Sequence, residues 1–254
     1  MPVAPDLRAR LERGDRLVGT FLQVPSLVTA ELLGSLGVDF LCVEAEHSAM
    51  SRETVHVLVA GASSAGTPAL VRVADNAVLE IAGALDAGSA GVIVPRVDSA
   101  DEAAAAVRAA RFPPVGARGL GPSRAAGYGR TVPEYLARAD AETLVGVQIE
   151  SPASVRDARA IAQVEGLDFV FVGPGDLAAS MGLPFGDERV ADAALSVLAA
   201  AREAGRPAGI WAPSAPVARG WLDAGFHLVI VGSDLGVLAD GVERLVAELS
   251  DAGR

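Results

Sequence analysis

The chain has 254 residues, of which 51% are hydrophobic, and a formal net charge of −11. Its length matches the roughly 250 residues of one β/α barrel, and no linker divides it, so we expect a single domain over residues 1–254. The negative charge and scattered arginines argue against a nucleic-acid partner, and the longest apolar runs are too short for a membrane span or a secretory signal, so we expect a soluble, cytoplasmic protein.

Short apolar runs alternate with longer alanine-rich segments, as is typical of repeated strand–helix units. Eight strands are expected near Leu17–Leu22, Phe40–Glu44, Ala69–Val73, Gly91–Val94, Leu144–Glu150, Phe169–Val172, Ala208–Trp211 and Leu228–Val231. Helices are expected, among others, over Ser26–Leu36, Arg52–Ser63, Ala77–Leu85, Ala100–Ala110 and Val190–Ala204. Eight units in this length favour an α/β fold with a closed (β/α)8 barrel over an open, doubly wound sheet.

The stretch from Arg111 to Arg138 interrupts this alternation with Pro113, Pro114 and several glycines. We interpret it as a long functional loop or a short extra element between the fourth and fifth strands.

The second predicted strand ends in Glu44, and Glu46 and His47 follow it closely. Catalytic groups of a β/α barrel lie at the carboxyl ends of its strands. An imidazole there suits general-base catalysis near neutral pH, whereas the alternative is a solvated loop with a capping glutamate. We favour His47 as a general base.

Arg72 ends the third predicted strand and is expected at the same mouth. Its planar donor fork suits a carboxylate or a developing enolate oxygen. The alternative is a structural salt bridge to Glu44 or Glu46, and Arg72 can serve both purposes.

The fifth and sixth predicted strands deliver two carboxylates, Glu150 and Asp176, to that mouth. Neighbouring carboxylates repel each other, and a hard divalent cation such as Mg²⁺ or Mn²⁺ compensates them. Alternatively, Asp176 caps a helix and Glu150 pairs with an arginine. Gln148 points the same way as Glu150, and the glycines around Gly175 allow backbone N–H groups to approach a small carboxylate ligand.

These residues resemble the HpcH/HpaI family of metal-dependent (class II) pyruvate aldolases over nearly the whole chain. The resemblance is carried by Ala30–Leu33, Glu46–His47, Val71–Val73, Leu85–Gly88, Arg111–Gly119, Val147–Glu150 and Gly173–Leu177.

The resemblance implies a barrel of the phosphoenolpyruvate/pyruvate-domain type and cleavage or formation of a 4-hydroxy-2-oxo acid from pyruvate and an aldehyde. It implies that Glu150 and Asp176 hold Mg²⁺ or Mn²⁺, with Co²⁺ as a further candidate. Gln148, Gly175, Asp176 and Arg72 would bind the 2-oxo acid, and Arg72 would stabilise the enolate. His47 would be the base, and Asp86 the acid that raises its basicity. Asp86 ends a predicted helix, where barrel geometry points away from the mouth, so we expect its contact with His47 to require a neighbouring subunit.

The resemblance also implies a homohexamer, a trimer of dimers, in which C-terminal helices are exchanged between barrels. One departure is Glu44-Ala45, where the family usually has Asp-Gly before Glu-His. In the loop Gly119–Arg130, either Arg124 or Arg130 is a candidate contact for an acidic acceptor, with a solvated arginine as the alternative.

Two other functions stay open at this point. The fold also resembles citrate synthases of siderophore biosynthesis, which condense an acyl thioester with oxaloacetate. A non-catalytic metal-binding scaffold or sensor is the remaining alternative, although a base, an enolate stabiliser and metal ligands occurring together favour an enzyme.

Overall fold

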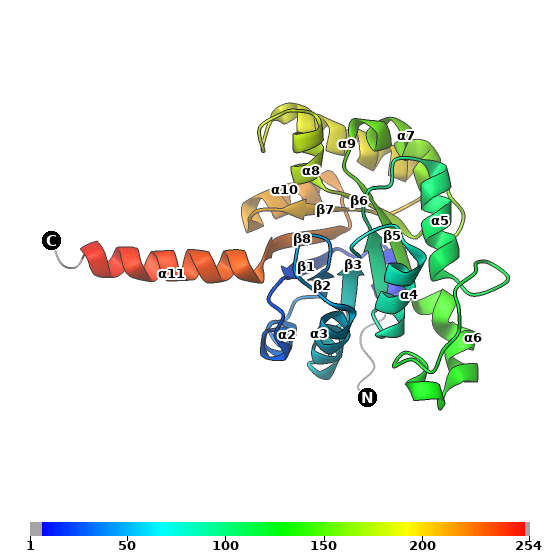
Figure 1. The fold of residues 1–254 in the computed structure, drawn as a ribbon. Helices are drawn as coiled ribbons and strands as arrows, with labels where there is room; N and C mark the ends of the chain where they lie inside the picture. The colour runs from blue at the N-terminus through cyan, green and yellow to red at the C-terminus, as the bar shows by residue number, and fades with distance from the viewer. Residues whose placement is uncertain (1–6, 252–254) are drawn as a thin grey trace.

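The computed structural model describes residues 7–251, and within them eight parallel strands close into one barrel (Figure 1). Each strand pairs with the next in sequence, and β8 returns to β1. The strands are β1 (Leu17–Leu22), β2 (Phe40–Glu44), β3 (Ala69–Arg72), β4 (Gly91–Val94), β5 (Leu144–Ile149), β6 (Phe169–Val172), β7 (Ala208–Ala212) and β8 (Leu228–Ser233). The predicted closed barrel is confirmed, and the open-sheet alternative is wrong.

Helices cover the outside of the barrel, as the alternating sequence pattern predicts. They are α1 (Leu7–Glu12), α2 (Leu27–Gly34), α3 (Arg52–Ser64), α4 (Val78–Asp86), α5 (Ala100–Ala110), α6 (Val132–Glu142), α7 (Pro152–Ala162), α8 (Pro174–Ser180), α9 (Glu188–Glu203), α10 (Ala215–Ala224) and α11 (Asp234–Asp251). The expected helices begin and end close to their predicted ranges. No helix of the described residues is long and apolar enough to cross a membrane.

The segment between β4 and β5 that interrupts the sequence pattern is an ordered element. It contains a 3₁₀ turn (Gly127–Gly129) and the start of α6. Phe112, Ala126, Tyr135 and Ala139 form a small apolar cluster of their own, with the Phe112 and Tyr135 rings packed edge to face. Of the two alternatives, a long loop or a short extra element, the structure shows the extra element.

The barrel interior is filled with side chains. Phe40 and Phe169 are fully buried there, and each lies against a glycine of a neighbouring strand. A Cβ atom at Gly19 would lie 2.5 Å from the Phe40 ring, and one at Gly146 would lie 2.2 Å from the Phe169 ring. This packing closes the interior, so that chemistry is confined to the ends of the barrel.

The order of the strands in the barrel follows the sequence, so β2 lies beside β3 and β5 beside β6, with β4 between the two pairs. Register pairs Glu44 with Arg72, and Ile149 with Val172. The strand-end residues singled out by the sequence are thereby brought to one mouth.

Candidate active site

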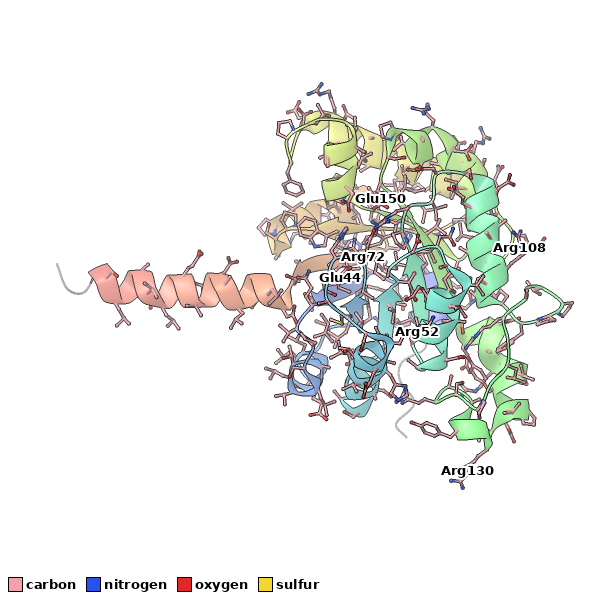
Figure 2. The ribbon with its side chains drawn as sticks, in the orientation of Figure 1. Glu44, Arg52, Arg72, Arg108, Arg130 and Glu150 are labelled. Atoms are coloured by element: carbon pink, nitrogen blue, oxygen red, sulfur yellow. The ribbon has the colours of Figure 1, made fainter. Side chains whose placement is uncertain are left out.

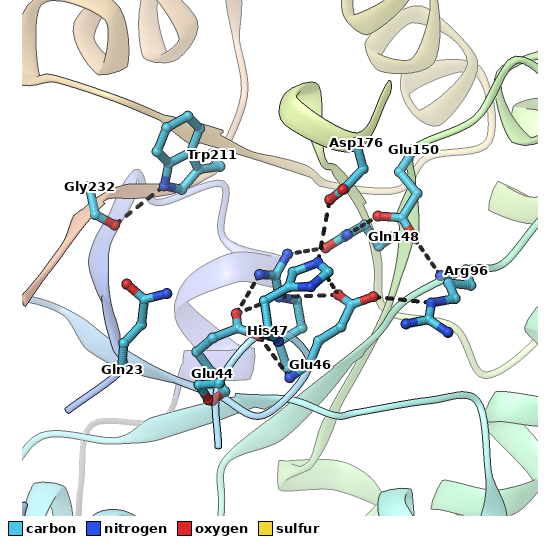
Figure 3. A network of polar contacts seen from close by, with 12 residues as sticks. Gln23, Glu44, Glu46, His47, Arg96, Gln148, Glu150, Asp176, Trp211 and Gly232 are labelled. Atoms are coloured by element: carbon cyan, nitrogen blue, oxygen red, sulfur yellow. Dashed lines mark hydrogen bonds and ion pairs between the residues drawn. The ribbon is translucent and has the colours of Figure 1, made fainter. Parts of the chain in front are cut away.

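Glu44, at the end of β2, is fully buried and joins two parts of the mouth (Figure 3). Its Oε1 accepts the backbone N–H groups of Glu46 and His47, at 2.8 and 2.9 Å. Its Oε2 pairs with the Arg72 guanidinium at 2.5 Å. Glu44 therefore fixes both the turn that carries His47 and the position of Arg72.

Arg72 lies almost completely buried, at 8% exposure, among partners on several strands. Besides Glu44, its Nη1 donates to Gln148 Oε1 at 3.3 Å, and its Nε lies 3.5 Å from Glu46 Oε2. The guanidinium also stacks over the Phe21 ring, 4.6 Å from the ring centroid. Burial alone would lower the pKa of Arg72, but Glu44 outweighs it and raises that pKa, so the cation is permanent. Both alternative salt-bridge partners, Glu44 and Glu46, therefore contact Arg72.

Glu150 follows β5 directly and is buried, at 8% exposure. Its Oε1 accepts the backbone N–H of Arg96 at 2.7 Å, and its Oε2 accepts from Gln148 Nε2. A Cβ atom at Gly173 would lie 3.0 Å from Gln148 Nε2 and 3.3 Å from Glu150 Oε2, so glycine leaves room for this pair. Burial raises the pKa of Glu150, and the nearby Asp176 carboxylate raises it further, against the two hydrogen bonds.

Asp176 lies in the first turn of α8, and its side chain is half exposed. Its Oδ2 is 3.8 Å from Nε2 of His47, whose imidazole is also half exposed. The same His47 nitrogen lies 3.6 Å from Glu46 Oε2. Figure 2 shows Glu44, Arg72 and Glu150 gathered at the same place in the barrel. The predicted residues His47, Arg72, Gln148, Glu150 and Asp176 are thus brought together.

Asp86 is not part of this group within one chain. It ends α4, and the helices of a β/α barrel run back towards the opposite end from the strand termini. Its Oδ1 accepts from Arg118 Nη2 at 2.7 Å. Among residues 7–251, no hydrogen bond or ion pair joins Asp86 to His47, so the role of Asp86 stays a prediction.

The sequence predicts no catalytic or substrate-binding role for two further residues of the mouth, Glu46 and Arg96. The Glu46 side chain is only 2% exposed, and its Oε1 accepts from Arg96 Nε at 3.3 Å. Its Oε2 lies near Arg72 and His47 but accepts no hydrogen bond from residues 7–251. Burial raises the pKa of Glu46, although Arg72 lowers it in part. Arg96, just past β4, adopts a left-handed backbone with φ 57°. Its position after a strand end was a usable signal.

The donor set of the mouth fits a hard divalent cation. Glu150 and Asp176 both offer oxygen ligands, and the Asp176 carboxylate is close enough to raise the pKa of Glu150. Among the described residues, no group of three or more His, Cys, Asp or Glu side chains forms a metal cage. Mg²⁺ is commonly held by one or two carboxylates, with water and substrate oxygens completing its shell, so two carboxylates suffice.

The fold and the mouth define a β/α-barrel enzyme with a carboxylate pair beside a buried guanidinium. The sequence model of the HpcH/HpaI aldolase/citrate lyase family matches residues 17–241. The chain belongs to this family, and it is a lyase. The predicted family is therefore confirmed.

Relatives across nearly the whole chain carry aldolase names. The chain is 38% identical to a 4-hydroxy-2-oxovalerate aldolase of Rhodococcus jostii, covering 94% of both chains. It is 39% identical to a 5-keto-4-deoxy-D-glucarate aldolase of Salmonella arizonae, covering 90% of both.

Solved structures show the same fold. A HpcH/HpaI aldolase/citrate lyase family protein of Burkholderia cenocepacia superposes with a TM-score of 0.91 at 36% identity, covering 96% of this chain and 98% of the other. The citrate synthase SbnG superposes with a TM-score of 0.88 at 28% identity, covering 97% and 98%.

Proposed function

We propose that this protein is a divalent-metal-dependent aldolase that cleaves or forms a 4-hydroxy-2-oxo acid, with pyruvate and an aldehyde as the other reactants. The observation that carries the proposal is the buried Arg72 guanidinium, held by Glu44 and Gln148 beside the Glu150 carboxylate. A fixed cation in a buried site stabilises charge that develops on a substrate oxygen, because no reorganisation is needed.

In the proposed mechanism, Glu150 and Asp176 would hold Mg²⁺ or Mn²⁺, with Co²⁺ as a further candidate. When bound, such an ion supplies Lewis-acid polarisation of the 2-oxo group. Gln148 and the backbone at Gly175 would bind the 2-oxo acid, with Gly175 offering open space where a side chain would stand. This division leaves the proton transfers to the protein's own side chains.

His47 would take the proton of the 4-hydroxyl group as the C3–C4 bond breaks, and the aldehyde would leave. The electron pair of that bond would pass into the enolate of pyruvate, whose oxygen Arg72 would stabilise. Return of a proton to C3 would complete pyruvate. The half-exposed imidazole suits this task, because it reaches both the mouth and solvent.

Asp86 would raise the basicity of His47 from a neighbouring subunit of a homohexamer. The support for an assembly is α11, which extends away from the barrel in Figure 1 and contacts it through β1 and β8. Seven of its apolar side chains are exposed: Leu235, Val237, Leu238, Val242, Leu245, Val246 and Leu249. Exposed apolar stripes of this kind mark protein interfaces, and exchange of α11 between barrels would cover this one.

A screen of 4-hydroxy-2-oxo acids, with lactate dehydrogenase reporting pyruvate, tests the proposal. We expect pyruvate release from at least one member of a series that varies the aldehyde portion, and its loss in Arg72→Ala. If neither pyruvate release nor aldehyde-dependent pyruvate consumption occurs with Mg²⁺, Mn²⁺ or Co²⁺ present, the proposal is wrong.

A second candidate is condensation of an acyl thioester with oxaloacetate. The likeness to the citrate synthase SbnG favours it. Thiol release from acetyl-CoA that depends on oxaloacetate would support this second candidate, whereas aldehyde-dependent consumption of pyruvate would support the aldolase.

A further inference from the structure

The proposed function does not specify the acceptor aldehyde, and the position of Arg96 bears on the chemistry of that acceptor. Arg96 lies two residues past the end of β4 at the same mouth as Glu150 (Figure 3). Its φ of 57° is unusual for a residue with a long side chain and costs roughly 1 kcal/mol or more. Such a conformation persists where surrounding contacts enforce it.

Two contacts hold Arg96 in this conformation. Its backbone N–H donates to Glu150 Oε1 at 2.7 Å, and its side-chain Nε donates to Glu46 Oε1 at 3.3 Å. Glu46 is buried and faces Arg72 with its other oxygen, 3.5 Å from Arg72 Nε. The guanidinium groups of Arg72 and Arg96 therefore lie on the two oxygens of one carboxylate.

The guanidinium groups of Arg72 and Arg96 differ in how many of their N–H donors are paired within residues 7–251. Arg72 is 8% exposed and engages Glu44, Glu46 and Gln148. The Arg96 side chain is 61% exposed, and among residues 7–251 its one hydrogen bond is the Nε contact to Glu46. Its Nη1 and Nη2 donors therefore have no hydrogen-bond partner among the described residues. A planar pair of such donors matches a carboxylate with two parallel hydrogen bonds.

We infer that Arg96 selects acceptor aldehydes that carry a carboxylate at the end remote from the aldehyde carbon. This inference rests on the proposed aldolase function. Arg72 binds the oxygens at the reacting carbons. Arg96, which shares the Glu46 carboxylate with Arg72, binds the carboxylate at the far end of the acceptor. The acceptor is then a short oxo acid rather than an uncharged aldehyde.

The other candidate arginines lie elsewhere. Arg124 donates to the backbone oxygen of Ala87, next to Asp86 at the end of α4. Arg130 lies at the periphery of the molecule, well apart from Glu44, Arg72 and Glu150 in Figure 2. Within one chain, Arg96 alone of the three shares hydrogen-bond partners with the mouth among residues 7–251, so it is the better placed to contact an acceptor there.

The test compares two aldehydes of equal carbon number, succinic semialdehyde and butanal, as acceptors for pyruvate in the metal-loaded enzyme. The measured quantity is the ratio of their kcat/KM values, since a general loss of activity cancels in it. Arg96→Asn removes the charge while keeping a residue that tolerates positive φ. Arg96→Lys keeps the charge without the fork, and Arg130→Asn is the matched control.

We expect the parent enzyme to prefer succinic semialdehyde, and Arg96→Asn to lower the ratio about 10- to 100-fold, the range for loss of a charge-assisted hydrogen bond. Arg96→Lys should lie between the two, and Arg130→Asn should leave the ratio as in the parent. A ratio in Arg96→Asn within about twofold of the parent overturns the inference, as does a fall confined to Arg130→Asn.

If the proposed aldolase function itself is wrong, the assay gives a different result from the one expected when only the role of Arg96 is wrong. In that case neither aldehyde would support pyruvate consumption in the parent enzyme. An enzyme that consumes pyruvate with both aldehydes, and whose preference ignores Arg96, would remain an aldolase while the inference about Arg96 is rejected.

Discussion

Replacing Glu44 with glutamine isolates the charge that holds Arg72. The amide oxygen of glutamine can still accept the backbone N–H groups of Glu46 and His47, now 2.8 and 2.9 Å from Oε1. The amide NH₂ group would replace Oε2, which pairs with Arg72 at 2.5 Å, so the N–H donors of the amide would face the N–H donors of the guanidinium. A buried cation would then lose its counter-charge.

The size of the effect follows from this burial. Glu44 is fully buried and Arg72 is 8% exposed, so solvent cannot replace the lost partner. Removing one partner of a buried ion pair costs about 3–5 kcal/mol, which corresponds to roughly 10 °C in Tm for a chain of this size. Turnover should fall by about 10²- to 10³-fold, the range for loss of one oxyanion donor, because Arg72 leaves its position.

Thermal unfolding followed by circular dichroism, together with steady-state kinetics on the same preparations, measures both effects. Glu142→Gln is the control, because Glu142 forms an exposed ion pair with Arg138 that is worth at most about 0.5 kcal/mol. Glu44→Asp keeps the charge on a shorter side chain and should be milder than Glu44→Gln. A Glu44→Gln variant as stable and as active as the Glu142→Gln control would refute the assigned role of Glu44.

Three further predictions concern separate parts of the molecule. Arg72→Ala should lower turnover by about 10²- to 10³-fold in the pyruvate assay, whereas Arg52→Ala, which removes an exposed partner of Glu80, should not; equal effects would remove Arg72 from the mechanism. Burial, with Arg202 and Arg16 nearby, lowers the pKa of His227 below 6.5, so the unfolded chain binds more protons and stability falls as pH drops through 6.5. Urea unfolding at about pH 7.5 and about pH 5.5 should show a smaller loss in His227→Gln than in the parent, and an equal loss would count against this pKa direction. The double substitution Leu238→Glu and Leu245→Glu, at two positions on α11 that are each 61% exposed, should reduce the molecular mass of the assembly measured by sedimentation. An unchanged mass would show that α11 does not hold the assembly.

The sequence predicts the barrel well because most strands are short, mainly apolar runs, each followed by a helical segment. In β2 and β6 these runs are buried on both faces, as is typical of strands in a parallel sheet. The strand-end rule then places His47, Arg72 and Glu150 at one mouth without any knowledge of distances. The boundaries differ slightly, as at Glu150, which follows β5 rather than ending it.

The roles of Glu44 and Arg96 depend on geometry that the sequence does not contain. Glu44 was noticed as a departure from the usual family pattern, but its two backbone acceptor contacts depend on how the chain turns after β2. The left-handed backbone of Arg96 is unexpected for an arginine, because positive φ is predicted most readily at glycine. Asp86 remains a proposal for the related reason that its partner would come from another chain.

Exchange of the C3 hydrogens of pyruvate with deuterium, followed by NMR, tests the central claim most directly, because it needs no aldehyde and reports enolate formation alone. With Mg²⁺ or Mn²⁺ present, the parent enzyme should exchange these hydrogens, and both EDTA treatment and Arg72→Ala should stop the exchange. No exchange in the metal-loaded parent, or exchange that persists after EDTA treatment and in Arg72→Ala, would contradict a metal-assisted pyruvate enolate at this site.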